Sequence, residues 1–409
     1  MDFNPSSEGA SVLKKVTEFV DKKILPIEER YFKELRALDN RWVVLPIIKE
    51  LKKQAQELGL WNLFLPKSEL GAGINNSDYA LMAEQMGRSF IAPEIFNCNA
   101  PDTGNMEVLV HYGNEEQQNR WLKPLLAGEI RSAFCMTEPQ VASSDATNIE
   151  ASAIIDGQEV ILNGTKWWST GVGHPDCKVI IFMGLSDPNA SKHAQHSMVL
   201  VPMDSVGVKV ERMLSVFGEF DEPYGHGEVS FTNVRLPKSA IIAGVGRGFE
   251  IAQGRLGPGR VHHCMRAIGA AERALQLLIE RGISRDAFGK PILNLGGNRD
   301  IIANGRIAIE QARLLTLKCA WLLDTKGIMG ALSEVSQIKV VVPNILQSIV
   351  DQAIQIHGGA GLSEDVPLTA LFTYARCLRL ADGPDEVHRS MVARIELKKY
   401  YNLIKKNTK

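Results

Sequence analysis

Apolar and polar positions follow two different periods along the chain, and the change of period divides it into three parts. Over the first 130 residues or so, apolar residues recur every three or four positions, as in the stripe of Val12, Val16 and Phe19, which is typical of amphipathic helices. Ser7 is suited to cap this first helix. Further helices are predicted over 45–58 and 77–86, and a capping box at Asn114-Glu115-Glu116-Gln117 opens another.

At Arg131 the pattern changes to that of strands. Asp156-Gly157 between two apolar runs predicts a tight hairpin, because Gly readily supplies the positive φ of such a turn. Asn163-Gly164 predicts a second turn. Further strands are predicted at Val179–Met183, Ser197–Val201, Val206–Met213 and Glu228–Phe231. This part is therefore interpreted as a small, mostly antiparallel β-domain.

From Gly246 onward the helical period returns in long stretches. They lie at about 247–282, 298–325, 331–357 and 384–404. Long amphipathic helices joined by short Gly or Pro breaks predict an antiparallel bundle. The fold class is therefore mainly α with a central β-domain, divided into a helical domain (1–130), a β-domain (131–240) and a C-terminal helical bundle (241–409).

Composition narrows the class of protein. The 409 residues are 45% hydrophobic with a formal net charge of -1, so no basic surface points to nucleic acid or to a membrane. The six cysteines are scattered singly and are interpreted as thiols of a reducing compartment: Cys98, Cys135, Cys177, Cys264, Cys319 and Cys377. The N-terminus resembles neither a signal peptide nor a transit peptide, and no apolar run is long enough to span a bilayer. A cytoplasmic location is expected.

Four segments carry candidate chemistry. The loop 133–145 gathers hydroxyls and backbone amides that suit a cofactor, 166–171 holds two adjacent tryptophans that could wall a planar ring, and 355–361 holds a Gly pair that lets a backbone approach a pyrophosphate. Each also has a plain structural interpretation, as a Ser-rich loop, a filled domain seam and a tight turn. The fourth segment, 380–389, places Asp382 at a Gly-Pro helix break, where a carboxylate can face a cavity and take up a proton. Its plain interpretation is a turn residue.

Two further patterns do not predict a binding site. Gly244-Val245-Gly246-Arg247-Gly248 lacks the full Gly-x-Gly-x-x-Gly spacing and a βαβ context, so a nicotinamide-binding Rossmann fold is not expected. The histidines at 174, 193, 196 and 226 lie in polar segments without metal-ligand spacing, so they are expected to be solvated and no metal is predicted.

Taken together, these segments resemble the acyl-CoA dehydrogenase family over nearly the whole chain. The order of the Thr-Glu-Pro loop, the Lys-x-Trp-x-Thr segment, the Gln-x-x-Gly-Gly segment and a carboxylate followed by Gly matches the family. Arg285-Asp286-Ala287-Phe288-Gly289-Lys290 and Arg260 match as well. The form Asp-Gly-Pro-Asp-Glu-Val-His-Arg is most similar to a branch that animals carry fused to a kinase-like domain.

The resemblance implies a bound FAD, and carries its contacts to particular positions. The implied cofactor-binding residues are Phe134, Met136, Thr137, Ser143, Ser144, Trp168, Ser169, Thr170, Arg285, Gln355, Gly358, Gly359, Pro384 and Glu386. Of these, Arg285, Gln355, Gly358 and Gly359 are implied to reach the adenine half of a neighbouring subunit's FAD, in a homodimer or homotetramer. The implied substrate-side residues are Ser144, Gly257, Arg260 and Gly383.

By the same resemblance, Asp382 removes the α-proton of an acyl-CoA while hydride leaves the β-carbon for the flavin. The thioester carbonyl is implied to be polarised by the backbone N–H of Asp382 and by a flavin hydroxyl. Electron-transferring flavoprotein is the implied electron acceptor.

The chain also departs from the family pattern. Its base is Asp where most relatives have Glu, Gly259 closes the alternative base position on the first bundle helix, and Leu295-Gly296 replaces a His-Gln or His-Glu pair that contacts the flavin. Lost bulk at Ala381, Gly257, Pro258 and Gly259 favours a long, branched or substituted acyl chain. Two alternatives remain: a flavin oxidase similar to nitroalkane oxidase, and a catalytically inactive relative that binds acyl-CoA.

Overall fold

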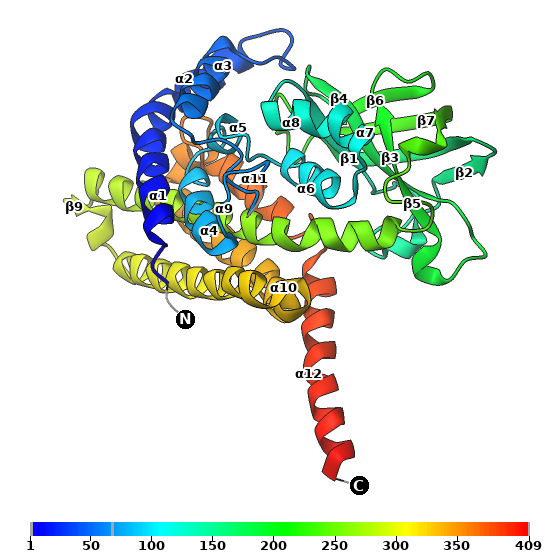
Figure 1. Cartoon of the computed structure of the whole chain (residues 1–409). Helices are drawn as coiled ribbons and strands as arrows, with labels where there is room; N and C mark the ends of the chain where they lie inside the picture. Colours follow the sequence, from blue (N-terminus) through cyan, green and yellow to red (C-terminus); the bar gives the residue numbers. More distant parts are fainter. Residues whose placement is uncertain (1–2, 67–68, 408–409) are drawn as a thin grey trace. The chain divides into compact units, whose positions relative to one another are not determined.

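The structure, a computed structural model, describes residues 3–66 and 69–407; of 256–258, 402–403 and 405–407 it describes only the backbone. The chain forms two compact units (Figure 1). The sheet unit comprises Ile27–Gly73 and Glu94–Leu256, and the bundle unit comprises Met1–Pro26, Ile74–Pro93 and Gly257–Lys409. The predicted three-part division at residues 130 and 240 stays a prediction.

Helices dominate both ends of the sequence. They are α1 (Ser7–Phe19), α2 (Leu25–Arg36), α3 (Pro46–Glu57), α4 (Asn76–Met86), α5 (Ala92–Ile95), α6 (Asp102–Tyr112), α7 (Glu115–Gln117), α8 (Lys123–Ala127), α9 (Gly248–Ser284), α10 (Asn298–His357), α11 (Leu368–Leu378) and α12 (Asp385–Asn407). The strands are β1 (Arg131–Cys135), β2 (Ser152–Asp156), β3 (Glu159–Thr170), β4 (Cys177–Leu185), β5 (His196–Pro202), β6 (Val208–Leu214), β7 (His226–Pro237), β8 (Asp286–Ala287) and β9 (Lys290–Pro291). This arrangement confirms the predicted fold class of helical ends around a central β-domain.

The sheet unit is built on one sheet with the strand order β1-β4-β2-β3-β7-β6, and β5 pairs with the edge of β4. β4 pairs in parallel with β1 and β2, whereas the remaining pairs are antiparallel, so the prediction of a mostly antiparallel sheet is confirmed. The hairpin predicted at Asp156-Gly157 joins β2 to β3, with Gly157 at φ 60°. Phe182, Val199 and Phe231 are among the buried residues that fill the core of the unit.

The predicted turn at Asn163-Gly164 is wrong. Both residues lie inside β3, where the pairing with β7 shifts register and Gly164 has φ 134°. A Cβ at Gly164 would lie 2.5 Å from the Cβ of Ala151. The glycine therefore permits a strand irregularity with a close backbone approach, which the dipeptide alone cannot distinguish from a turn.

The prediction that the four loop histidines are solvated is wrong for two of them. His174 and His196 are 4% and 1% exposed. The His174 ring stacks on Tyr224 and its Nδ1 accepts a hydrogen bond from the backbone N–H of Asp176, while His196 Nε2 lies 2.9 Å from the carbonyl oxygen of Ile149. Local backbone partners compensate the burial of these polar rings, and such partners are not visible in a spacing pattern.

Burial of His174 makes the stability of the protein depend on pH. Burial, followed by the charges of Arg131 and Lys52, lowers the pKa of His174 from 6.5 to about 3. The unfolded state therefore binds a proton between these two values that the folded state does not, so the free energy of unfolding falls as the pH falls through this window. From pH 6.5 to 5 this histidine accounts for a loss of up to about 2 kcal/mol. His174→Asn keeps a side-chain acceptor for the Asp176 N–H and is expected to flatten the pH dependence measured by urea unfolding. The exposed His111→Asn is the control, and equal slopes in both variants would contradict the assignment.

The bundle unit is organised around α10. This helix packs against α4, α11 and α12, and α1 packs against α4. Gly327, at φ 67° and ψ -177°, interrupts α10 between the two predicted helices 298–325 and 331–357, so that pair of predictions is confirmed. α11 was not predicted. α12, drawn red in Figure 1, projects from the rest of the bundle unit and exposes Tyr400 and Tyr401.

A cluster of buried charges joins the helices of the sheet unit to β1. Arg131 is 1% exposed and its guanidinium pairs with Glu94, lies 3.3 Å from an oxygen of Asp102 and donates a 2.7 Å hydrogen bond to Asn97. Lys52 forms a second ion pair with Glu94. Burial raises the pKa of Asp102 to about 6, against the opposing effect of two hydrogen bonds from Ser132 and of the charge of Lys52.

Candidate functional site

In the sheet unit, the two segments singled out around residues 134–144 and 166–170 lie side by side. The backbone N–H of Trp167 donates to the carbonyl oxygen of Thr137 at 3.0 Å. The Lys166 ammonium donates to the carbonyl oxygen of Met136 and, at 2.7 Å, to the Glu138 carboxylate. Glu138 in turn accepts the backbone N–H groups of Glu150 and Ala151. A buried ion pair therefore fixes the loop after β1 against β3.

The predicted cofactor residues of this unit differ in exposure. Phe134, Met136, Thr137 and Thr170 are half-buried, Ser144 and Trp168 are exposed, and Ser169 is buried. The Arg255 guanidinium lies 3.9 Å from the ring centroid of Phe134 and donates to Asn105. Thr170 Oγ1 lies 2.9 Å from His226 Nδ1.

Ser143 has a local structural role. Its hydroxyl accepts the backbone N–H of Glu138 at 2.9 Å and lies within donating distance of the carbonyl oxygens of Glu138 and Val141. This contact closes the loop on itself. The predicted cofactor contact of Ser143 stays a prediction.

The tryptophan pair has the chemistry expected beside a planar, polar ligand. Trp168 has φ 50° and lies at a register shift between β3 and β7, which turns its 40% exposed side chain out of the strand alternation. Trp167 Nε1 is buried and has no acceptor among the residues that the structure describes. A buried N–H donor without an acceptor and an adjacent exposed indole fit a flavin, which carries both acceptors and an aromatic face.

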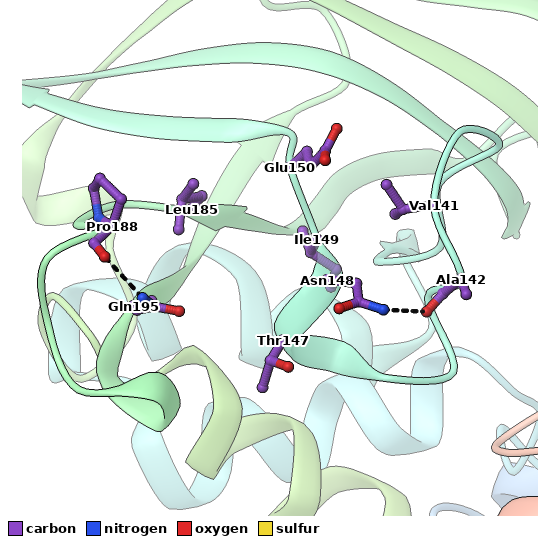
Figure 2. Close-up of a pocket in the computed structure, with 9 residues that line it drawn as sticks. All are labelled: Val141, Ala142, Thr147, Asn148, Ile149, Glu150, Leu185, Pro188 and Gln195. Carbon is purple, nitrogen blue, oxygen red and sulfur yellow. Dashed lines mark hydrogen bonds between the residues drawn. The ribbon is translucent and has the colours of Figure 1, made fainter.

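A pocket of about 500 Å³ opens beside the same loop (Figure 2). Its residues come from the loop after β1 and from the ends of β4 and β5: Val141, Ala142, Thr147, Asn148, Ile149, Glu150, Leu185, Pro188 and Gln195. The side chains of Asn148 and Gln195 donate to the carbonyl oxygens of Ala142 and Pro188. The polar groups of Thr147, Asn148, Glu150 and Gln195 lie among apolar side chains here, so the pocket offers both kinds of contact to a ligand.

In the bundle unit, Asp382 lies in a tight turn between α11 and α12. Asp382 and the following Gly383 both have positive φ values, 55° and 103°. Positive φ is uncommon for a residue with a side chain and indicates that the surroundings hold the backbone there. The turn is closed by Asp385, whose carboxylate accepts from Arg379 Nε at 2.9 Å and whose N–H donates to the Arg379 carbonyl oxygen.

Three helices hold the carbonyl groups of this turn. Lys339 on α10, which is 2% exposed, donates to the carbonyl oxygens of Leu378 and Ala381 at 2.5 and 2.7 Å. Arg260 Nε on α9 donates to the carbonyl oxygen of Asp382 at 3.1 Å. His388 Nε2 on α12 lies 3.2 Å from the same oxygen and must be the donor, because a carbonyl only accepts. Charged and neutral donors thus replace the water that would solvate the turn.

Gly383 is required by its position in this turn. A Cβ built there would lie 2.9 Å from His388 Nε2, in addition to the strain that φ 103° imposes on any other residue. The residue is therefore explained by the turn geometry and by the approach of His388. Its predicted substrate contact remains a prediction.

The side chain of Asp382 faces cationic and polar groups of the bundle unit. Its Oδ2 lies 3.6 Å from His263 Nε2, and an Arg266 nitrogen lies 3.2 Å from His263 Nδ1. Burial lowers the pKa of Arg260 and of Lys339, and both groups interact electrostatically with Asp382. Burial also lowers the pKa of His388 to about 4, which keeps that ring neutral near pH 7.

The remaining predicted residues lie at exposed points of the bundle unit. Arg285, Gln355, Gly358, Gly359 and Glu386 are exposed, and Pro384 is half-buried. Phe288 is 95% exposed on the hairpin of β8 and β9. A Cβ at Gly358 or Gly359 would meet no heavy atom of the described residues within 4 Å, which leaves space for a ligand to approach that backbone. For Gly257, which was predicted to contact the substrate, only the backbone is described.

Sequence reasoning missed three residues around Asp382. They are His263, Lys339 and His388. Two of them could have been noticed in the sequence. His388 lies inside the Asp-Gly-Pro-Asp-Glu-Val-His-Arg motif, and Lys339 is a charged residue within an apolar helical stretch. His263 could be suspected only from its spacing of three from Arg260 on one helix.

The described residues form neither a metal-binding cluster nor a membrane-spanning helix. No group of three or more His, Cys, Asp or Glu side chains there could hold a metal ion. None of the helices in the described ranges is long and apolar enough to cross a membrane. The cytoplasmic location stays a prediction.

Comparison with known proteins gives consistent matches along the chain. Models described as the N-terminal, middle and C-terminal domains of acyl-CoA dehydrogenase match residues 6–129, 133–234 and 246–397. Acyl-CoA dehydrogenase family member 10 of Mus musculus is 54% identical over 403 residues, which cover 96% of this chain and 38% of the mouse protein. The chain spans about half the length, or less, of the first curated relatives that it matches.

Comparison with solved structures points to the same family. A Mycobacterium abscessus protein assigned to the acyl-CoA dehydrogenases is 64% identical, with a TM-score of 0.95 over 97% of this chain and 100% of that chain. A glutaryl-CoA dehydrogenase of Mycobacterium smegmatis, solved in complex with FADH2, is 25% identical, with a TM-score of 0.79 over 95% of this chain and 94% of that chain.

Proposed function

Because the chain belongs to the acyl-CoA dehydrogenase family, we propose that it catalyses the FAD-dependent α,β-dehydrogenation of a fatty acyl-CoA thioester, with Asp382 as the base. The observation that carries the proposal is the turn at Asp382. A half-buried carboxylate is held at positive φ by donors from three helices, beside His263, Arg260 and Lys339. Such preorganisation is expected of a group that must meet one carbon–hydrogen bond.

The role of the protein's own residues follows from this geometry. The Asp382 carboxylate takes the α-proton and becomes a neutral acid. Arg260 and Lys339 favour the charged carboxylate before the transfer, because nearby cations stabilise a negative charge. FAD, when bound, would supply the acceptor for the hydride that leaves the β-carbon, which would balance the α-proton taken up by Asp382.

The cofactor site is proposed to be shared between subunits. An isoalloxazine site in the sheet unit is supported by the Trp167 N–H, which has no acceptor in the described part of the chain, by the exposed Trp168 and by the Thr137 loop. The exposed Arg285 and Phe288 and the open backbone at Gly358 and Gly359 support contact with a second subunit's FAD, in a homodimer or homotetramer. The remaining cofactor positions assigned from the sequence are kept in this proposal. Electron-transferring flavoprotein is the proposed electron acceptor.

The proposed substrate has a long, branched or substituted acyl chain. A Cβ at Gly259 would meet no heavy atom of the described residues within 4 Å, and Ala381 is exposed. Space at these positions leaves a short straight chain without packing partners, at about 0.8 kcal/mol for each methylene that stays unburied.

The decisive test is reduction of the purified flavoprotein by a panel of acyl-CoA thioesters without oxygen. We expect loss of the yellow flavin absorbance with long-chain, branched or hydroxylated acyl-CoA, at rates tens to hundreds of times those for butyryl-CoA. A preference for butyryl-CoA would contradict the substrate class. Reduction by nitroalkanes with oxygen uptake would favour the oxidase, and binding without reduction by any thioester would favour the inactive relative.

A further inference from the structure

We propose that His263 is a positioning residue for Asp382, and that Arg266 holds it in the tautomer this role requires. The inference rests on the proposed function, since it assigns a part to His263 in proton abstraction by Asp382. The two residues come from different parts of the bundle unit: His263 lies on α9, and Asp382 lies in the turn before α12.

The contacts of His263 determine which of its ring nitrogens carries the hydrogen. Arg260, His263 and Arg266 follow one another at spacings of three on α9 and therefore share one side of the helix. Arg266 lies 3.2 Å from His263 Nδ1 and can only donate, so Nδ1 is the acceptor. The proton of the neutral imidazole is then on Nε2, which is the nitrogen 3.6 Å from Asp382 Oδ2.

The distance of 3.6 Å is longer than a hydrogen bond and within the range of an electrostatic contact. Catalytic contacts are often long without substrate and shorten in the complex. An N–H directed at Oδ2 favours the charged carboxylate and limits rotation of its plane about the Cβ–Cγ bond. Such a constraint matters for an aspartate base, because its short side chain has few torsion angles with which to reorient the carboxylate toward the substrate.

Other charged groups around Asp382 set the context for this contact. Arg260 from α9 and Lys339 from α10 are cationic, and His388 from α12 is held neutral by burial, which lowers its pKa to about 4. The nearby carboxylate of Asp385 is engaged by Arg379 and Asn344. Because Arg266 occupies Nδ1 as a donor, Nε2 is the ring nitrogen that carries the hydrogen, and His263 faces Asp382 as a donor.

The experiment compares His263→Ala, which removes the donor, with His263→Gln, which restores a neutral N–H at similar reach. The limiting rate of flavin reduction by the best acyl-CoA is measured between pH 5.5 and 9.5 by stopped-flow absorbance. For His263→Ala we expect a roughly 10- to 100-fold lower rate and an acidic limb displaced upward by about one pH unit, because the charged carboxylate has lost a donor. His263→Gln is expected to restore most of the wild-type rate and to return the acidic limb to near its wild-type position. His111→Ala, at an exposed position on α6, is the control.

A purely structural role predicts a different pattern. In that case His263→Ala and His263→Gln lose rate together and the acidic limb stays in place, which would overturn the proposal. A wild-type rate and pH profile in His263→Ala would overturn it as well.

A second measurement separates this proposal from the proposed function. The pKa of the Asp382 carboxyl is read in the substrate-free protein from ¹³C-aspartate spectra, with Asp382→Asn used to assign the signal. His263→Ala should raise this pKa by about one pH unit even if no acyl-CoA reduces the flavin. An unchanged carboxyl pKa overturns the role of His263, whereas failure of the whole acyl-CoA panel in the wild-type protein overturns the proposed function alone.

Discussion

Replacing Asp382 by asparagine is expected to lower turnover by about three decades or more, the largest effect of any single change considered for this chain. The amide is nearly isosteric with the carboxylate and is compatible with the contacts that Arg260 and His388 make to the backbone carbonyl oxygen of residue 382. It cannot take up the α-proton. The fold, the yellow colour of bound FAD and the binding of acyl-CoA are therefore expected to persist.

Rapid-mixing measurement of flavin reduction by the best acyl-CoA checks this result. Asp351→Asn, at an exposed position on α10, is the matched control and should reduce at the wild-type rate. Binding is measured separately, from the spectral change of the flavin on titration with product. If Asp382→Asn reduced its flavin within about tenfold of the wild-type rate, another group would have to be the base.

The largest expected effect on stability follows from replacing Arg131 by methionine. Arg131 is 1% exposed and serves Glu94, Asp102 and Asn97 at once, and methionine fills a similar volume without charge. Glu94 would keep Lys52, whereas Asp102 would keep the donors of Ser132 and the charge of Lys52 but lose its contact with the guanidinium. Leaving buried carboxylates without their cation is expected to cost about 3–5 kcal/mol of unfolding free energy.

Urea unfolding followed by tryptophan fluorescence and by circular dichroism measures this change. Arg235→Met is the control, because Arg235 pairs with Asp156 and Glu159 at a surface position where it is 46% exposed, and exposed pairs contribute about 1 kcal/mol or less. Equal midpoints for the two variants would show that the cluster around Arg131 is dispensable.

The regular parts of the fold could be predicted because local chemistry decides them. Asp156-Gly157 formed the predicted hairpin, and the capping box at Asn114 has both of its reciprocal hydrogen bonds. Asn163-Gly164 carried the same kind of signal and failed, since a partner strand and Ala151 determine the conformation there. A dipeptide reports which conformations are accessible, whereas the neighbouring strand selects among them.

Sequence motifs could indicate the candidate site residues within them. They could not indicate the residues that contact this turn from distant helices. The Gly-Pro break made Asp382 a candidate, and the resemblance of the other segments to the acyl-CoA dehydrogenase family was needed to prefer it over a turn residue. The contacts of Lys339 with Ala381 and of His263 with Asp382 could not be predicted, because the partners are 42 and 119 positions away in the sequence. α11 was not predicted, and without its C-terminus the Leu378 carbonyl group that Lys339 binds has no defined place.

The hold of three helices on one turn has a consequence for protein design. A segment copied from 380–389 into another helical scaffold would carry the aspartate, the glycine and His388, but neither Arg260 nor Lys339. Without those two donors, the carbonyl group of residue 381 would lose its partner and that of residue 382 would keep only His388, so the left-handed backbone at Asp382 would relax. A design would therefore have to reproduce the turn together with the contacting positions on α9, α10 and α12. The ten-residue motif by itself is not expected to keep this conformation in another protein.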